Sequence, residues 1–438
     1  PACNTVIFDE AHQLPEVATI FLGEHLGSGQ LLERARDSRA ESIAGARDFS
    51  ALPEACGRLE KAIKDLRLVF EQDAVRLPAH QLDGVAKFAP ALQELETQLA
   101  QLESLLQTQA ERSEGLLRCQ QRAAELAAQL ARWQQPGDAD WVRWVEVFSH
   151  GMQLNRTPLA VDNLFRKQVE GNAKAWVFTS ATLAVDGNFQ HFCGELGLDD
   201  AATGCWDSPF DYKSQALLYV PKQMPQPNSA EFTQAVVEQA WPALLASQGR
   251  AFLLFTSLRA MREAYELAKR RFDEQQLDYP LLLQGEGSRT ELLEKFRTSP
   301  HAVLVASQTF WEGVDVRGDA LQLVVIDKLP FAPPDDPVLA ARVEQMNKAG
   351  RNPFMEFQLP RAAITLKQGA GRLIRDETDR GVLIICDTRL VDKPYGKKIW
   401  KSLPPMLKTR DASVIPRFFA QSIESSGEAV DSPATDPI

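Results

Sequence analysis

Residues 5–18 read TVIFDEAHQLPEVA, and the apolar run that opens this stretch ends abruptly on Asp9 and Glu10. An unbroken run of Val, Ile and Phe, without polar alternation, is typical of a strand that is covered on both faces of a parallel sheet. In such sheets ligands bind beyond the carboxyl ends of the strands. Two carboxylates at this point therefore predict a functional site at the edge of a buried sheet.

Five further segments have the same form, a short apolar run followed by polar or turn residues. They are AWVFTSATL (175–183), RAFLLFTS (250–257), HAVLVASQ (301–308), LQLVVIDKLP (321–330) and GVLIICDTR (381–389). Helix-like stretches such as 257–275 lie between them. This alternation predicts an α/β protein with two parallel-sheet domains, each with helices on both faces of its sheet.

The region from about 20 to 155 differs, because it has almost no β-rich run. Apolar residues recur in it at spacings of three and four: Leu92, Leu95, Leu99, Leu102 and Leu106, then Leu126, Leu130 and Trp133. We interpret these stripes as the packing surfaces of two long helices folded back on each other, with an oligomerising zipper as the alternative. The region would then be an all-α insertion into the first α/β domain.

These patterns predict four parts of the chain. The first α/β domain is incomplete and comprises 1–19 and 156–204, the helical insertion is 20–155, the second α/β domain is 205–421, and the tail is 422–438. The tail is rich in Ser, Pro, Asp and Glu, so we expect it to be disordered.

Composition limits the class of protein. The six cysteines lack CxxC spacing, which favours neither a zinc site nor a disulfide framework and is typical of a cytoplasmic protein. No apolar run approaches the roughly 18 residues of a membrane span. The net charge of −11 gives no general attraction to nucleic acid, although a local basic groove is compatible with it. Residue 1 is not Met, and strand-like sequence follows at once, so we expect an N-terminally truncated fragment.

Asp9 and Glu10 form a pair of hard oxygen ligands suited to Mg²⁺. Mg²⁺ that bridges nucleotide phosphates is held by few protein carboxylates, and an adjacent carboxylate can orient the attacking water. Asp9 would serve the metal and Glu10 the water. The alternative is a simple helix cap, since acidic residues favour the first turn of a helix.

The segment TLKQGAGRLIRD (365–376) places Gln368, Arg372 and Arg375 at spacings of four and three. We expect them on one face of a helix, where two guanidinium groups suit a polyanion whose charge grows in a transition state. One of them would be an arginine finger. A solvated basic helix face is the alternative.

Read in order, DEAH (9–12), SATL (180–183), FTS (255–257), FWEGVD (310–315) and QGAGRLIR (368–375) resemble motifs II to VI of superfamily 2 helicases. FWEGVD, together with an insertion after DEAH, is similar to the XPD/DinG group. The resemblance implies two RecA-like domains, an Arch-type insertion and ATP-dependent 5′-to-3′ DNA unwinding in replication or repair, in a bacterial, nucleoid-associated cytoplasmic protein.

The resemblance also implies residue roles. Catalysis would fall to Asp9, Glu10, Gln368, Arg372 and Arg375, with Mg²⁺ held through the nucleotide by Asp9 and Glu10. Coupling of ATP binding to domain movement would fall to His12, Ser180, Thr182, Glu312, Gly313 and Asp315.

Two parts of the family pattern are missing from these residues. No GxxxxGK[ST] loop occurs to bind the phosphates of ATP, and no four cysteines precede DEAH to hold the 4Fe–4S cluster that the family carries there. We expect both upstream of Pro1, and we expect this fragment alone to be inactive.

Contacts to single-stranded or forked DNA are predicted from residue type. Thr256 and Ser257 would bind a phosphate, and Trp311 or Phe331 would stack on a base, unless these rings are simply buried. Lys397 and Lys398 lie in the most basic stretch of the chain, 392–410.

VIPRFF (414–419) places two aromatic residues beside a tail that cannot bury them, which favours docking on a partner. The resemblance implies one candidate, the chi subunit of the DNA polymerase III clamp loader, and no membrane. A non-catalytic interaction module that uses VIPRFF and the insertion is the alternative function. A metal-dependent hydrolase with Asp9, Glu10 and His12 would need more ligands.

Overall fold

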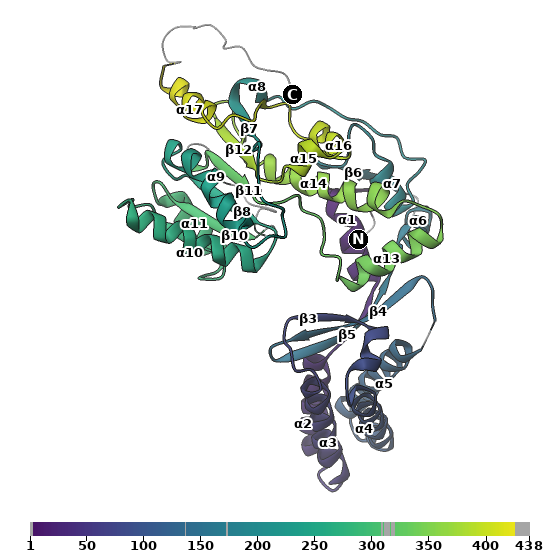
Figure 1. The fold of residues 1–438 in the computed structure, drawn as a ribbon. Helices are drawn as coiled ribbons and strands as arrows, with labels where there is room; N and C mark the ends of the chain where they lie inside the picture. Colours follow the sequence, from purple (N-terminus) through teal and green to yellow (C-terminus); the bar gives the residue numbers. More distant parts are fainter. Residues whose placement is uncertain are drawn as a thin grey trace.

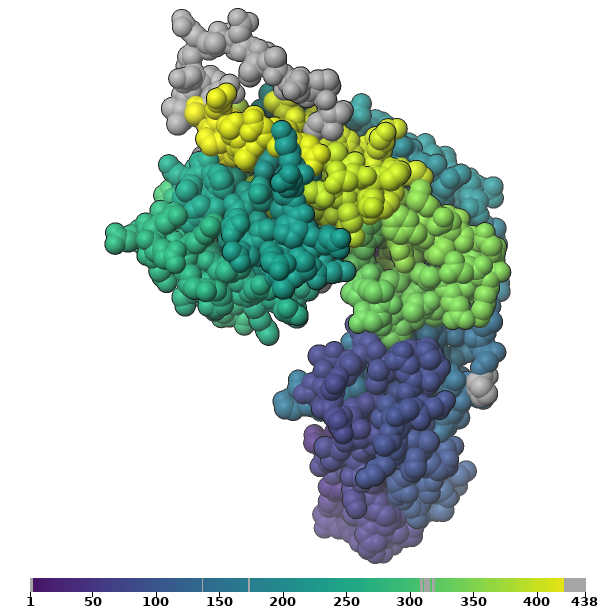
Figure 2. Space-filling view, in the orientation of Figure 1, coloured from purple at the N-terminus to yellow at the C-terminus, as the bar shows by residue number. Residues whose placement is uncertain are grey.

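The chain folds into two parallel sheets and an elongated insertion (Figure 1). The computed structural model describes residues 3–135, 137–171, 174–307, 310, 316 and 320–424, the side chains of 421–424 excepted. In space-filling view the insertion is a separate lobe, and a deep hollow lies between it and the part of the second α/β domain that is drawn in teal (Figure 2).

The smaller sheet consists, among the described residues, of two parallel strands. They are β1 (Thr5–Phe8) and β6 (Ala175–Phe178), in a register that pairs Phe8 with Phe178. Around them lie η1 (Ala11–Gln13), α1 (Leu14–Leu22), α6 (Asp162–Glu170) and α7 (Gln190–Leu196). Because the strands are parallel and in register, Asp9 and Thr179 follow them at the same edge.

The larger sheet has seven parallel strands in the order β13-β7-β12-β11-β8-β10-β9. Their bounds are β7 Ala216–Tyr219, β8 Ala251–Phe255, β9 Leu281–Leu283, β10 Val303–Ser307, β11 Leu323–Ile326, β12 Gly381–Ile385 and β13 Leu407–Thr409. Helices cover both faces, so every residue of β8 and β11 is buried. The predicted α/β class with parallel sheets is confirmed. The prediction that helices cover both faces of each sheet was wrong for the small sheet, where β1 and β6 alternate exposed and half-buried residues and Ile7 is 67% exposed.

The two faces of this sheet form two separate cores. Phe252 and Leu254 of β8 pack in one core, and Leu253 and Phe255 pack in the other. The first core is closed by α11 (Arg289–Thr298), α14 (Leu359–Ala370) and α16 (Gly396–Ser402), and the second by α9 (Phe232–Ala246), α10 (Leu258–Glu274) and α17 (Val414–Glu424). Shorter elements are α8 (Tyr212–Gln215), the π-helical turn η5 (Phe354–Gln358) and α15 (Arg389–Asp392).

The insertion is a helical bundle that stands on an antiparallel sheet. The bundle comprises α2 (Ser28–Gly45), α3 (Ala51–Leu68), α4 (Phe88–Gln109) and α5 (Glu114–Gln134), with η2 (Ala79–Gly84) and η3 (Ala110–Arg112). The sheet has the order β2-β5-β4-β3, from β2 (Glu24–Gly27), β3 (Val75–Pro78), β4 (Trp141–Phe148) and β5 (Gly151–Pro158). The leucine stripes of α4 and α5 lie in the bundle core, as predicted.

The prediction of an all-α insertion was wrong, because this sheet belongs to it. In β4 the buried Val145 and Val147 flank the less buried Glu146, which is the period-2 pattern of a strand with one covered face. Only Ser149 and His150 separate β4 from β5, so the pair is a hairpin. The residue ranges of the domains stay a prediction.

The VIPRFF segment is part of the second domain and does not project from it. It forms the start of α17, where Ile415 and Phe418 are buried against α9 and the sheet. Phe418 is only 4% exposed, and the guanidinium of Arg380 lies 4.2 Å from its ring centre. The prediction that these rings lack a packing surface was therefore wrong, because α9 supplies it. Beyond 424, the predicted disordered tail lies outside the described residues.

We expect Phe418→Ala to lower the free energy of unfolding by about 3–5 kcal/mol, because it removes a fully packed ring and leaves a cavity. Urea unfolding of the chain measures this. Phe419→Ala is the matched control, since its ring is only partly buried, and it should cost clearly less. If both variants lose the same small amount of unfolding free energy, Phe418 is not packed in this way, and docking of the segment on a partner becomes the better interpretation.

Among the described residues, no helix is both long and apolar enough to cross a membrane.

Candidate nucleotide site between the two domains

The acidic pair lies at the end of β1 in a tight turn. Glu10 adopts a left-handed backbone conformation, with φ of 49°, and its amide donates to Asp9 Oδ1 at 2.9 Å. Asp9 Oδ1 also accepts from Thr179 Oγ1 at 3.2 Å, across the edge of the sheet. Both carboxylates are exposed. The turn therefore points two adjacent carboxylates outward, as a metal-bound nucleotide would require.

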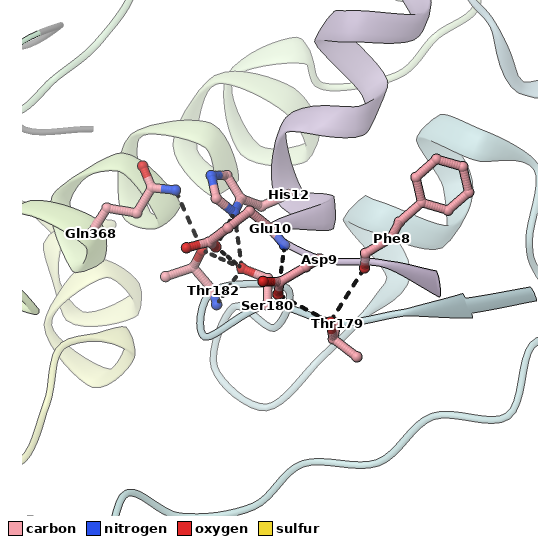
Figure 3. Close-up of polar contacts among 8 residues, drawn as sticks. All are labelled: Phe8, Asp9, Glu10, His12, Thr179, Ser180, Thr182 and Gln368. Carbon is pink, nitrogen blue, oxygen red and sulfur yellow. Dashed lines mark hydrogen bonds and ion pairs between the residues drawn. The ribbon is translucent and has the colours of Figure 1, made fainter. Parts of the chain in front are cut away.

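Ser180 is the centre of a hydroxyl cluster next to this turn (Figure 3). Its Oγ donates to Glu10 Oε2 at 3.0 Å, lies 2.8 Å from His12 Nδ1 and accepts from the amide of Thr182 at 3.2 Å. Thr182 is buried, and its Oγ1 lies 3.3 Å from Ser180 Oγ. DEAH and SATL are thus joined by direct hydrogen bonds, although about 170 residues separate them.

His12 is influenced by charged residues of both α/β domains. Burial lowers the pKa of His12, the carboxylate of Glu10 opposes this, and the charge of Arg372 lowers the pKa further. His12 is therefore neutral at pH 7. The charge of Arg372, a residue of the second domain, therefore reaches the DEAH turn.

Gln368 is the second residue that reaches across from the large sheet. It lies on α14, and its Nε2 is 3.5 Å from Thr182 Oγ1, at the long limit of a hydrogen bond. Figure 3 shows its side chain directed at the cluster. The structure thus brings together seven of the predicted site residues: Asp9, Glu10, His12, Ser180, Thr182, Gln368 and Arg372.

The helix expected through 365–376 ends early, at Ala370. Leu373 and Ile374 are buried in the core of the large sheet, so the chain turns inward. The carboxylate of Asp379 then accepts from the amides of Arg375 and Asp376, at 2.6 and 2.8 Å. Arg372 and Arg375 therefore do not share a helix face. The charge of Arg375 acts to lower the pKa of Tyr212, against the larger effect of burial.

The predicted DNA contacts at the end of β8 are partly occupied. The amide and hydroxyl of Thr256 both donate to Asp327, at 2.9 and 3.2 Å, so neither donor is available to a phosphate in this state. Ser257 is exposed, and its Oγ caps α10 by accepting from the amide of Ala260 at 3.2 Å. Its O–H can still donate to a phosphate. Asp327 was not predicted, but its place at the end of a buried strand was a usable signal.

Asp327 gives a pH-dependent prediction. Burial raises its pKa to about 6 despite hydrogen bonds from the amides of Lys328 and Thr256. A folded pKa above the unfolded value favours the folded state below about pH 4, and this advantage is lost as pH rises through 6. Against Asp327→Asn, which cannot titrate, the wild-type chain should lose up to about 3 kcal/mol between pH 4 and 7. Urea unfolding of both proteins checks this, and parallel pH profiles would contradict it.

The remaining residues predicted to contact DNA are Lys397, Lys398, Phe331 and Trp311. Lys397 and Lys398 are exposed on α16, which packs on α14. Phe331 is packed against Phe354 and Tyr395, with ring centres 5.5 and 6.1 Å away, so much of its surface is already covered. Trp311, Glu312, Gly313 and Asp315 lie outside the described residues.

A cavity of about 720 Å³ does not lie at the hydroxyl cluster. It lies between α7 and the segment that precedes α14, and its lining includes none of the seven residues above. Within the described ranges, no group of three or more His, Cys, Asp or Glu side chains is placed to hold a metal ion.

Comparison with known proteins gives sequence and fold relatives. Residues 241–406 match the family described as helicase C-terminal domain. Over 420 residues, 96% of this chain, the sequence is 40% identical to "ATP-dependent DNA helicase YoaA" of Escherichia coli, of which the chain spans 65%. It is 38% identical over 272 residues to "ATP-dependent helicase DinG" of Mycobacterium tuberculosis, covering 60% of this chain and 39% of that protein.

Among solved structures, an XPD helicase is similar over 92% of this chain and 68% of its own, with a TM-score of 0.56 and 14% sequence identity. An identity this low shows the fold alone, which is the XPD-type arrangement of RecA-like domains.

Proposed function

Because the chain is a relative of the YoaA and DinG proteins, we propose that it forms the greater part of the motor of an ATP-dependent DNA helicase. The observation that carries this proposal is the meeting of two domains at one cluster. Glu10, His12 and Ser180 belong to the domain of the small sheet, and Gln368 and Arg372 belong to the domain of the large sheet. A nucleotide bound there would contact both domains, so its hydrolysis could change their relative position.

The residues present fit Mg²⁺ and the γ-phosphate of ATP. Asp9 would hold the metal, which when bound neutralises phosphate charge. Glu10 is exposed beside it and would accept the proton of the attacking water. Arg372 would stabilise the charge that develops on the transferred phosphoryl group, as an arginine finger does. Hydrogen bonds through Ser180, His12 and Thr182 would link the state of the nucleotide at Glu10 to the position of Gln368 in the second domain.

The chain spans 65% of the length of the YoaA protein of Escherichia coli. We propose that the phosphate-binding loop, which these residues lack, is supplied by sequence outside them. A 4Fe–4S cluster does not fit the cysteines present, since Cys56 and Cys119 are buried in the core of the insertion, Cys386 is buried in the second domain, and no group of three or more possible ligands gathers among the described residues. We propose that such a cluster would also be held outside these residues.

The substrate of the motor would be single-stranded or forked DNA, unwound with 5′-to-3′ polarity during replication or repair. Support comes from the relatives' names and from the capped end of α10, where Ser257 keeps a free donor. Lys397 and Lys398 would add phosphate contacts. We propose a cytoplasmic, nucleoid-associated protein, with the chi subunit of the clamp loader as a candidate partner.

The test uses the full natural polypeptide that contains these 438 residues. Hydrolysis of ATP should depend on Mg²⁺ and rise with single-stranded DNA, and a fork with a 5′ tail should be opened in preference to one with a 3′ tail. DNA-independent hydrolysis without strand separation would reject the proposal. Under the same conditions the 438-residue chain alone should show no turnover.

A further inference from the structure

Helix α13 (Pro337–Lys348) belongs by sequence to the second domain, because it lies between β11 and β12. Among the described elements, however, it packs most extensively against β4 and β3 of the insertion. Its Val338 and Ala341 face an apolar cluster formed by Val142, Trp144 and Leu159. Figure 1 shows α13 above the base of the insertion and apart from the seven-stranded sheet.

Polar contacts tie both ends of α13 to the insertion. Asp336 caps the helix by accepting from the amides of Val338 and Leu339, and its Oδ2 accepts from Arg76 Nη1 of β3 at 3.0 Å. At the other end, Gln345 Nε2 donates to Asp140 Oδ1 at 3.2 Å. The helix is therefore held along its length by the lobe that contains β3 and β4.

The middle of α13 contacts the first domain through Arg342, whose side chain is only 12% exposed. Its Nη2 donates to Thr19 Oγ1 of α1 at 3.1 Å, and its Nη1 lies 3.8 Å from Glu195 of α7. The guanidinium also lies 5.2 Å from the ring centre of Phe357 in η5. Helix α1 begins two residues after His12, so Arg342 holds the helix that follows the acidic turn.

The chain joins α13 to β11 on one side and to α14 on the other, and Phe357 is a further contact within its own domain. A cavity of about 720 Å³ is lined by Arg342 and Met346 of α13, by Leu359 of α14, and by Leu159 and Glu195. Pro330, Pro333 and Pro334 precede the helix, and Gly350, with φ of 68°, follows it. Side-chain contacts thus hold α13 to the insertion and to α1, and the chain joins it to the second domain, so the helix links all three parts.

We propose that α13 is a coupling strut, a piece of the second domain that is built into the insertion and into α1, and that transmits movement of the second domain to the insertion. The proposal rests on the proposed motor function only for the source of that movement. The attachment itself can be tested without any activity.

The first test is amide hydrogen exchange in the 438-residue chain. Asp336→Asn keeps an acceptor for the helix cap and removes the charge that pairs with Arg76. Exchange in α13, β3 and β4 should become about fivefold faster, with β8, β11 and β12 unchanged. The neighbouring Asp335→Asn is the control, since Asp335 is exposed. If α13 exchanges unchanged, or together with β11 and β12, the strut does not exist.

The second test measures coupling in the full natural polypeptide. Arg342→Met keeps the aliphatic stem and removes the contacts to Thr19 and Glu195. Hydrolysis stimulated by single-stranded DNA should stay within about twofold of the parent, while base pairs opened per ATP should fall about tenfold, and Asp336→Asn should act in the same direction. A general loss of structure would lower both rates by one factor, which would overturn the proposal. Absence of hydrolysis in the parent would instead reject the motor function, and hydrogen exchange would still decide on the strut.

Discussion

Glu10→Gln should reduce the rate of ATP hydrolysis by about 10²- to 10⁴-fold in the full natural polypeptide, because an amide cannot accept the proton of the attacking water. The amide oxygen of Gln can still accept from Ser180, whose Oγ lies 3.0 Å from Glu10 Oε2. The turn should therefore keep its shape, and nucleotide affinity should remain close to that of the parent. Steady-state hydrolysis and binding of a fluorescent ATP analogue measure the two effects separately.

Glu170→Gln is the matched control, since Glu170 is an exposed carboxylate at the end of α6 in the same domain. It should leave hydrolysis unchanged. If Glu10→Gln also leaves hydrolysis and unwinding unchanged, the acidic turn is a helix cap and the chain serves as a scaffold.

Arg372→Ala should lower hydrolysis by about 10³-fold or more, with a smaller effect on nucleotide binding, because an arginine finger acts mainly on charge that develops in the transition state. Arg372→Lys should recover only a part, since an ammonium group cannot form the paired bonds of a guanidinium. Arg372 was predicted from sequence, and its charge acts on His12 of the cluster.

The same variant has a second readout that does not need activity. Because the charge of Arg372 lowers the pKa of His12, its removal should raise that pKa, as followed by NMR titration of the His12 ring in the 438-residue chain. Arg375→Ala should leave the His12 titration unchanged, since Arg375 acts on Tyr212 instead. An equal effect of both arginines on His12 would mean that they share one surface after all.

The strands of the large sheet were predictable because burial on both faces requires an unbroken run of apolar residues in the sequence. The run FLLF fills β8, and its alternate side chains enter two different cores. The acidic turn was predictable for a related reason, since charged residues directly after such a run have no place in the core. The order of the motifs then indicated which edges should meet.

What the sequence could not reveal depends on partners that are distant along the chain. Helix α14 ends at Ala370 because the sheet core draws in Leu373, and Thr256 loses its donors to Asp327, 71 residues later. Likewise Phe418 is covered by α9. In the insertion, by contrast, the sequence did contain the pattern of a strand, the two-residue alternation of β4. It follows long helical repeats and was interpreted as part of the helical region.

The strand order of the large sheet has a consequence for biosynthesis. β7 lies between β12 and β13, both of which are translated more than 160 residues after it. Until the ribosome has made them, the fully apolar ALLY strand has no neighbour on either side, and α17, which follows β13 in the chain, still has to cover the sheet. Nascent chains of this protein should therefore depend on chaperones until these elements have emerged, and stalling before residue 407 should leave an aggregation-prone intermediate.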